Sequence, residues 1–229
     1  MNIGGLQKIS LIDYPGKICA ILFTQGCNFR CPYCHNPELV DPDLFEKCIP
    51  EEDFFSFLEK RRGKLDAVSI TGGEPTIQPD LVEFVERVKG MGYLVKIDTN
   101  GSRPEVLEKL IDRGLVDYIA MDVKAPLKRY REITKSNVKP DRIKQSIKVI
   151  MDSGVEYEFR TTVVKSLLNK NDLQKITNLI KDARLYVLQK FVPSKALDEK
   201  FLSETPYSDE DLEAMKEKLK NYVQCVVAR

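Results

Sequence analysis

The sequence predicts an α/β fold, namely a single-domain, open partial barrel of the (β/α)6 type. Two observations lead to this class. Short apolar segments alternate with amphipathic segments of ten or more residues, and 229 residues suffice to bury one core. Strands separated by helices pair in parallel through right-handed crossovers. About six such units are visible, too few to close an eight-stranded barrel, although the pattern alone also permits a doubly wound sheet.

The strands are predicted where apolar and β-branched residues follow one another without helical spacing. The first of them contains the longest apolar run of the chain, Ile18 to Phe23. In chain order the predicted strands cover Lys17 to Phe23, Ala67 to Ile70, Tyr93 to Ile97, Tyr118 to Met121, Glu156 to Val164 and Leu185 to Leu188.

The helices are predicted from apolar residues spaced three and four apart, with prolines in the first turn and glycines after the last. The predicted helices cover 50–60, a segment opened by Pro79, 104–113, a segment between Pro140 and Gly154, 171–182 and an amphipathic tail over 208–222. The single domain then divides into an N-terminal extension (1–16), a barrel core (17–192) and a C-terminal extension (193–229).

Composition and charge exclude several functional classes. The 36 lysines and arginines nearly cancel the 35 aspartates and glutamates, giving a formal charge of +1 without the basic stripe of a nucleic-acid-binding protein. No apolar segment approaches the ~20 residues that a membrane span needs, and residues 1–16 lack a continuous apolar stretch. We therefore expect a cytoplasmic protein with neither nucleic acid nor membrane as a partner.

Three of the six cysteines lie in the loop after the first predicted strand, where Cys27, Cys31 and Cys34 have the spacing C-x3-C-x2-C. Cysteine thiolates are the usual ligands of iron–sulfur clusters. Three of them on one short loop can hold three irons of a 4Fe-4S cluster, which leaves the fourth iron free to bind another molecule. The remaining cysteines form no second spaced set, so the sequence predicts one cluster.

A zinc site is the alternative for this loop. Zinc accepts three thiolates and one imidazole in a tetrahedral set, and His35 directly follows Cys34. Adjacent residues can bind one ion only with strain, and zinc sites more often combine two separated pairs of ligands. A disulfide is less favoured, because nothing in the chain indicates an oxidising compartment.

Four further polar segments each follow or end a predicted strand, and the carboxyl ends of parallel strands meet at one edge. Each has an ordinary structural explanation as well: a glycine pair before proline and an Asn-Gly pair are turn signals, and Asp-x-Lys is commonly a surface pair. Arg160, in a strand suited to burial, needs an anionic partner, which is either the carboxylate of a bound molecule or a structural partner such as Glu158 or Asp122. The four segments are Thr71 to Pro75, Asp98 to Gly101, Asp122 to Lys124 and Arg160 to Thr162.

The cysteine loop resembles that of radical S-adenosylmethionine (SAM) enzymes, with Tyr33 between the last two cysteines and His35-Asn36 after them. The segments Gly4 to Lys8 and Leu11 to Lys17, followed by Cys-Pro-Tyr-Cys-His-Asn-Pro, resemble the activases of glycyl radical enzymes. Among these, the chain is most similar to the longer type of anaerobic ribonucleoside-triphosphate reductase activating protein. The resemblance also implies the open partial barrel.

The resemblance implies a 4Fe-4S cluster, SAM and, as in some relatives, a monovalent cation. It places the glycine-rich segment at the methionine amine, Lys124 at the methionine carboxylate, and Asp98, Thr99 and Asp122 around the ribose and carboxylate. No catalytic residue is expected beyond the cluster and the cofactor. The histidine that ends the last strand in some relatives is missing, and Gln189 stands in that stretch. The implied cofactor-binding residues are Tyr33, His35, Gly72, Gly73, Glu74, Pro75, Asp98, Thr99, Asp122, Val123, Lys124 and Arg160.

The implied activity is reductive cleavage of SAM, followed by removal of a hydrogen from one glycine of a partner enzyme that inserts a loop into the open side of the barrel. The implied partner is anaerobic ribonucleotide reductase, with flavodoxin or ferredoxin as the electron donor. Three alternatives stay open at this point: an activase of pyruvate formate-lyase or another glycyl radical enzyme, a small-molecule enzyme such as a carboxy-deazaguanine synthase, and a non-catalytic zinc scaffold.

Overall fold

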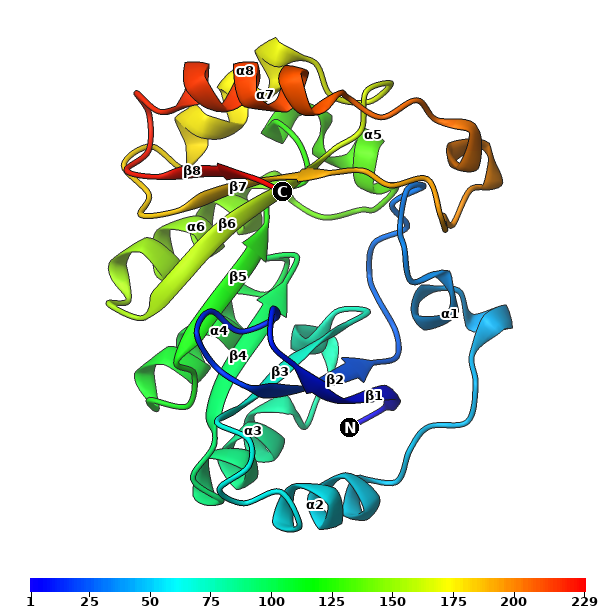
Figure 1. Ribbon diagram of the computed structural model, residues 1–229, viewed down its shortest axis with the longest axis vertical. Helices are drawn as coiled ribbons and strands as arrows, with labels where there is room; N and C mark the ends of the chain where they lie inside the picture. Colours follow the sequence, from blue (N-terminus) through cyan, green and yellow to red (C-terminus); the bar gives the residue numbers. More distant parts are fainter.

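The strands of the sheet follow one another in space in chain order in the computed structural model, which describes residues 1–229 (Figure 1). The first pair is antiparallel and every later pair is parallel. A doubly wound sheet would reverse its order partway, so this order fits the open barrel and not that alternative. The strands are β1 (Ile3–Ser10), β2 (Cys19–Thr24), β3 (Ala67–Gly72), β4 (Leu94–Thr99), β5 (Tyr118–Asp122), β6 (Glu156–Val163), β7 (Tyr186–Lys190) and β8 (Val226–Ala228).

Strands β2 to β7 are the six predicted strands, each within two residues of its predicted ends. The two edge strands, β1 and β8, are not predicted by the apolar pattern. β1 lies in the segment described above as an N-terminal extension, and its Gly4-Gly5 and Gln7-Lys8 pairs interrupt any alternation of apolar side chains. β8 has only three residues and pairs with β7 alone, so it is too short to produce a pattern.

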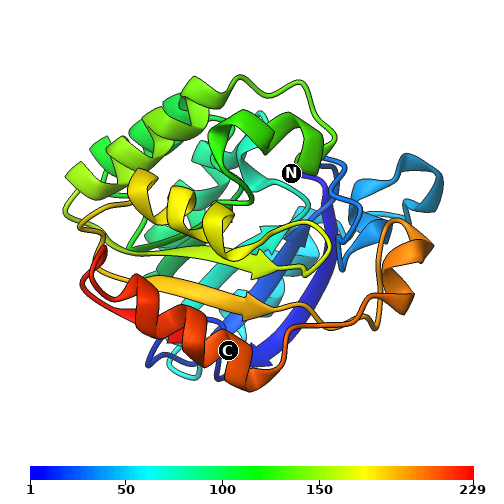
Figure 2. The ribbon, with the colours of Figure 1, turned by 90° about the horizontal axis from the view of Figure 1, so that it is seen from above.

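The longer helices lie on the outer side of the sheet, as the view from above shows (Figure 2), whereas α1 lies beside the cysteine loop. Six of them correspond to the predicted helices; α1 and α5 are additional helices of four and five residues. Four short 3-10 helices lie in the loops. None of the α-helices has the length and apolar character required to cross a bilayer. The helices are α1 (Pro37–Val40), α2 (Glu51–Glu59), α3 (Leu81–Gly90), α4 (Pro104–Asp112), α5 (Tyr130–Thr134), α6 (Pro140–Asp152), α7 (Lys170–Leu179) and α8 (Asp209–Leu219).

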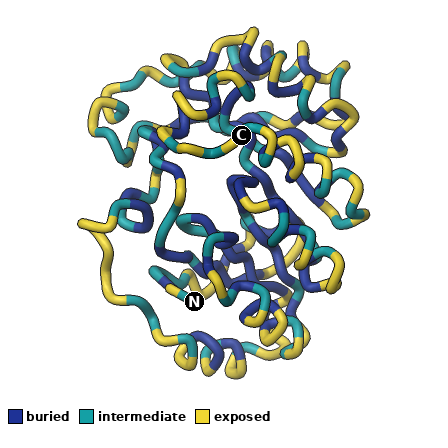
Figure 3. The backbone as a smooth tube through the Cα atoms, turned by 180° about the vertical axis from the view of Figure 1, so that it is seen from behind, coloured by how far each residue is buried: buried dark blue, intermediate teal, exposed yellow.

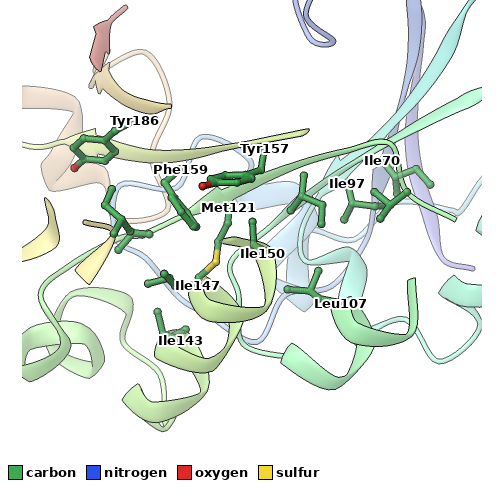
Figure 4. Close-up of a cluster of buried hydrophobic side chains, with 14 of the residues drawn as sticks. Ile70, Ile97, Leu107, Met121, Ile143, Ile147, Ile150, Tyr157, Phe159 and Tyr186 are labelled. Carbon is green, nitrogen blue, oxygen red and sulfur yellow. The ribbon is translucent and has the colours of Figure 1, made fainter. Parts of the chain in front are cut away.

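The main hydrophobic core lies between the outer face of the sheet and the helices. Figure 4 shows Met121 of β5 and Phe159 of β6 packed toward the isoleucines of α6, among them Ile147 and Ile150. Because side chains alternate along a strand, the residues between these core positions point to the other face of the sheet. Figure 3 shows the strands buried and the outer surfaces of the helices exposed.

The inner face of the curved sheet, here called the lumen, differs from the outer face. At the amino-terminal ends of the strands it holds a small apolar cluster, in which Tyr14 from the β1–β2 loop contacts Tyr118 with ring centroids 5.7 Å apart. Toward the carboxyl ends the lumen side chains are polar or charged, including Lys96, Asp98 and Arg160. The fold therefore separates an apolar outer core from a polar lumen.

Candidate active site

A cavity of about 240 Å³ lies at the carboxyl ends of the strands. It brings together side chains from the carboxyl ends of six neighbouring strands, β2 to β7, and from the loops that follow them, as the strand arrangement predicts. Ten of the twelve residues singled out above as cofactor-binding line it, together with all three loop cysteines. The other two, Pro75 and Val123, are buried nearby and do not line it. The cavity is lined by Cys27, Phe29, Cys31, Tyr33, Cys34, His35, Asn36, Val40, Thr71, Gly72, Gly73, Glu74, Asp98, Thr99, Asn100, Asp122, Lys124, Arg160, Thr162 and Gln189.

The three thiols form one wall of the cavity. Burial raises the pKa of Cys27 to about 12 and that of Cys31 to about 11, and it also raises the pKa of Cys34. Thiols in so dry a setting become thiolates only when a cation replaces the proton. No group of three or more His, Cys, Asp or Glu side chains is arranged to hold one metal ion. Ligands of a cluster need no such convergence, because each thiolate binds a different iron.

The cysteine loop is held in place mainly through its backbone. The Arg30 guanidinium donates from Nη1 to the carbonyl oxygens of Cys27, at 2.6 Å, and Phe29, at 2.9 Å. The Asn100 side chain donates to Asn28 Oδ1 at 2.9 Å and lies 3.9 Å from the Cys27 sulfur. The β4 loop thus fixes the first cysteine of the motif.

The glycine pair after β3 packs closely against the cysteine loop. A β-carbon on Gly73 would lie 2.0 Å from the carbonyl oxygen of Gly26, the residue before Cys27. Gly72 has φ +108°, which favours glycine, and a β-carbon there would lie 2.5 Å from the backbone nitrogen of Thr24. The sequence argument assigned these glycines to close approach by a ligand. The structure shows that they also permit close approach by the cysteine loop itself.

Glu74 joins the β3 and β4 loops. Its Oε1 accepts hydrogen bonds from Thr99 Oγ1 at 2.7 Å and from the hydroxyl and backbone N–H of Thr76, while Oε2 accepts from the backbone N–H of Asn100 at 2.6 Å. Burial of the carboxyl group raises its pKa despite these donors. A ligand ammonium group would share the carboxylate with these four bonds, so Glu74 has a structural role in addition to the ligand contact that the sequence suggests.

A network of charged side chains forms the opposite wall. Arg160 donates from Nε to Asp122 at 2.9 Å and from Nη1 to Asp98 at 3.0 Å. Asp98 also pairs with Lys96, and Asp122 pairs with Lys124 at 3.1 Å. Burial alone would raise the pKa of Asp122, but Arg160 and Lys124 outweigh it and lower that pKa to about 2. Asp98 has a lowered pKa for the same reasons, with Arg160 and Lys96 as the cations.

In this network the Arg160 guanidinium has the anionic partners that its burial requires. Its guanidinium is bound to carboxylates of the chain, one of which, Asp122, is among the predicted structural partners, whereas Glu158 lies farther away at 3.8 Å. The lysines and the arginine of the network also bind Asp98 and Asp122. These are the carboxylates near which the resemblance would place a monovalent cation. Lys124 has one carboxylate partner and, unlike Lys96, lines the cavity, so it is the cation of the wall best placed to accept a second anion.

His35 and Tyr33 tie the cysteine loop to the segment that follows β7. The His35 ring stacks on Phe191 with centroids 5.2 Å apart, and its Nε2 lies 2.9 Å from the Val192 carbonyl oxygen. Tyr33 packs edge-on against Phe191 at 6.4 Å. His35 and the three cysteines are not arranged around one point as ligands of a single ion, so the structure does not form the Cys3His zinc set considered as an alternative.

The sequence argument overlooked several residues of the site. Lys96 is almost fully buried, and its position between Val95 and Ile97, both core residues, indicates that it points into the lumen. Asn100 had been treated as a turn residue together with Gly101. The turn is present, because Gly101 has φ +73°, but the Asn100 side chain also holds the cysteine loop.

The sequence model of the protein family described as the Radical SAM superfamily matches residues 21–182 of this chain. A protein of Methanocaldococcus jannaschii described as a glycyl-radical enzyme activating enzyme is 37% identical over 232 residues, which cover 99% of this chain and 95% of that protein. A pyruvate formate-lyase-activating enzyme of Clostridium pasteurianum is 28% identical, with 97% of each chain covered.

Among solved structures, Streptococcus suis SuiB bound to the precursor peptide SuiA has a similar fold. The TM-score is 0.70 at 16% sequence identity, and the alignment covers 91% of this chain and 48% of SuiB. At this level of identity the similarity concerns the fold alone.

Proposed function

Because this chain belongs to the radical SAM superfamily and, within it, to the glycyl-radical enzyme activating enzymes, we propose that it forms a glycyl radical on anaerobic ribonucleoside-triphosphate reductase. The observation that carries the proposed radical chemistry is the convergence of three thiols and the carboxyl ends of β3 to β7 on one cavity. The resemblance of the chain to the longer type of anaerobic ribonucleoside-triphosphate reductase activating protein supports the reductase as the partner.

The residues of the cavity fit the cofactors of the superfamily. Cys27, Cys31 and Cys34 supply three thiolates for a 4Fe-4S cluster, and no fourth cysteine lines the cavity. When bound, the reduced cluster supplies one electron to SAM, which splits into methionine and a 5′-deoxyadenosyl radical able to take a hydrogen atom from glycine. Flavodoxin or ferredoxin is the proposed source of that electron.

In this scheme the side chains of the protein bind SAM and hold it in position. Lys124 binds the methionine carboxylate, and its partner Asp122 keeps it charged within the buried wall. Arg160 holds Asp98 and Asp122 ionised and in fixed positions, available to hydroxyl donors of the ribose. Tyr33 and the backbone around His35 lie beside the cysteines and are the proposed contacts for the adenine. Proton transfer by a side chain has no place in this scheme.

Pyruvate formate-lyase is the second candidate partner. It is favoured by the similarity to the Clostridium pasteurianum activating enzyme, which extends over 97% of both chains. The cofactor site itself does not distinguish the two partners, because both activations need the same radical.

The two partners are distinguished by reconstituting the chain anaerobically with iron and sulfide, reducing it, and adding SAM with either enzyme. Electron paramagnetic resonance of each mixture then reports the product. A glycyl doublet on the reductase alone supports the proposal, and a doublet on pyruvate formate-lyase alone transfers it to the second partner. Formation of 5′-deoxyadenosine with no doublet on either enzyme would exclude both partners.

A further inference from the structure

Lys96 is a buried lysine on the lumen face of β4, and its side chain is only 3% exposed. Its neighbours in the chain, Val95 and Ile97, belong to the outer core. Removing an ammonium group from water is costly, so a lysine in such a place needs an anionic partner. Asp98, two residues further along the strand, is that partner. The function proposed above gives Lys96 no role, which leaves its burial to be explained.

Lys96 stands behind the charged wall of the candidate active site. It does not line the first cavity but lines a second one, of about 260 Å³, on the other side of that wall. Arg160 and Gln189 line both cavities and so belong to the partition between them. The second cavity is lined by Ile12, Asp13, Pro15, Lys96, Glu158, Arg160, Gln189 and Arg229.

The two carboxylates of the wall have a cation of the chain on each of their four oxygens. On Asp98, Lys96 binds Oδ1 and Arg160 binds Oδ2 at 3.0 Å. On Asp122, Arg160 binds Oδ1 at 2.9 Å and Lys124 binds Oδ2 at 3.1 Å. A dissolved cation could bind these oxygens only by competing with one of the side chains. The wall therefore does not fit the monovalent cation that the resemblance implies.

The charges of the wall balance when SAM is added. In the proposed scheme Lys124 also binds the methionine carboxylate, so the wall then contains three carboxylates, those of Asp98, Asp122 and methionine. Lys96, Lys124 and Arg160 supply three positive charges. Without the ammonium group of Lys96, one negative charge in this buried region would lack a counter-charge, which is unfavourable.

No neighbouring group could replace that charge. Glu158 and Arg229 pair with each other at 3.1 Å, so together they add no net charge. Asp13, which also lines the second cavity, has no ion-pair partner and accepts a hydrogen bond from Ser10. It adds negative charge to the cavity and so increases the need for a cation beside it.

We infer that Lys96 is a built-in cation of the SAM site, which completes its charge balance so that SAM binds without a dissolved monovalent cation. The inference rests on the proposed function, because it counts the methionine carboxylate on Lys124. It makes Lys96 a positioning residue, since it acts on SAM through Asp98. A dissolved cation and SAM would be coupled through the same carboxylates, so removing the charge of Lys96 should make SAM binding depend on such a cation.

The test measures the dissociation constant of SAM by equilibrium dialysis, on the reconstituted chain before reduction, so that SAM is not cleaved. Potassium or sodium chloride replaces tetramethylammonium chloride at constant ionic strength. The wild type should bind SAM equally well in all three salts. In Lys96→Gln, which keeps a hydrogen-bond donor but loses the charge, the dissociation constant should rise about tenfold in tetramethylammonium chloride and recover in potassium or sodium chloride.

Two further variants separate the charge from the fold. Lys96→Arg keeps the positive charge and should bind SAM without a dependence on the salt. Lys89→Gln is the matched control, because Lys89 forms an ion pair with Asp117 at 2.8 Å and lines neither cavity. This control should also show no dependence. Urea unfolding of the metal-free variants checks that each of them is folded.

A requirement for potassium or sodium in the wild type or in Lys96→Arg overturns the inference, and either result can be obtained even if Lys96→Gln does not fold. Salt-independent binding by folded Lys96→Gln overturns it as well, and so does an equal salt dependence in Lys89→Gln. If the wild type carries its cluster but binds SAM in none of the salts, the proposed function fails first. If it binds SAM but forms no glycyl radical on either candidate enzyme, only the assignment of the partner fails.

Discussion

The two faces of the sheet are built from the same strands and have opposite characters. The outer face contributes to a core of 49 buried hydrophobic residues under the helices, whereas the apolar cluster in the lumen contains six. Within β4, Val95 and Ile97 face outward while Lys96 and Asp98 face the lumen. The alternation of a single strand thus supplies the fold on one side and the polar site on the other.

This difference indicates how a sheet of this kind can carry costly buried charges. The lumen keeps Lys96, Asp98, Asp122, Lys124, Glu158 and Arg160 in one connected network in which every charge has an opposite partner. Such groups contribute little net stability compared with apolar packing of the same volume. The outer core provides the stability, and the lumen can be specialised for binding.

Replacing Cys31 by alanine should abolish the function of the site in the lumen and leave the outer core intact. One of the three irons would lose its protein ligand, so the reconstituted variant should lack the brown colour and form no 5′-deoxyadenosine. The unfolding midpoint of the metal-free chain should change little, since only a small side chain is removed. Iron content and urea unfolding, measured on the same preparation, check both parts; a full complement of four irons in the variant would contradict the ligand assignment.

Replacing Phe159 by alanine should instead destabilise the outer core and leave the site in the lumen functional. The ring is fully buried between the sheet and the helices, and its removal should cost about 3–5 kcal/mol of unfolding free energy. The reconstituted variant, where it remains folded, should retain its cluster and cleave SAM. A loss of cleavage in folded, fully iron-loaded variant would show that the two faces are not independent.

Replacing Arg160 by methionine should change the way in which the free energy of unfolding depends on pH. The depressed pKa of Asp122 means that its ion pairs stabilise the fold above the ordinary carboxyl pKa of 3.8, and this contribution disappears as pH falls from about 4 to about 2. In the wild type, the lowered pKa of Asp122 contributes on the order of 2 kcal/mol to the free energy of unfolding. In the variant this contribution is already reduced at neutral pH. The stability difference between the wild type and the variant should therefore shrink between pH 7 and pH 3 in urea unfolding of the metal-free proteins. A constant difference would speak against the pairing.

The smallest effects are expected from alanine substitutions at two glycines, Gly73 and Gly90, which form a matched pair. An added β-carbon at Gly73 meets the Gly26 backbone, so Gly73→Ala should displace the cysteine loop, at a cost of about 1–3 kcal/mol, and lower the iron content. At Gly90, the last residue of α3, nothing lies within 4 Å, so Gly90→Ala should stabilise the chain by up to about 1 kcal/mol. Equal iron content in both variants would contradict the close approach of the two loops.

The sequence predicts the six central strands well because each is rich in apolar, aromatic or β-branched residues and ends at a polar loop, although β4 and β6 also carry charged residues. It also predicts that these loops share one cavity, which follows from the parallel order alone. It fails at the edges of the sheet, since β1 contains Gly4-Gly5 and β8 has three residues. It also leaves the partners of Arg160 open: Asp122 was a candidate, whereas Asp98 comes close only because β4, β5 and β6 are neighbours in the curved sheet.

The most direct measurement is the amount of 5′-deoxyadenosine formed from SAM by the anaerobically reconstituted, dithionite-reduced wild-type chain, with no partner enzyme present. If the lumen cavity holds the cluster and the cofactor as proposed, 5′-deoxyadenosine and methionine should form in equal amounts, and Cys31→Ala should form neither. A wild-type chain that carries four irons and an intact cluster, but leaves SAM uncleaved, would contradict the assignment of this cavity as the active site.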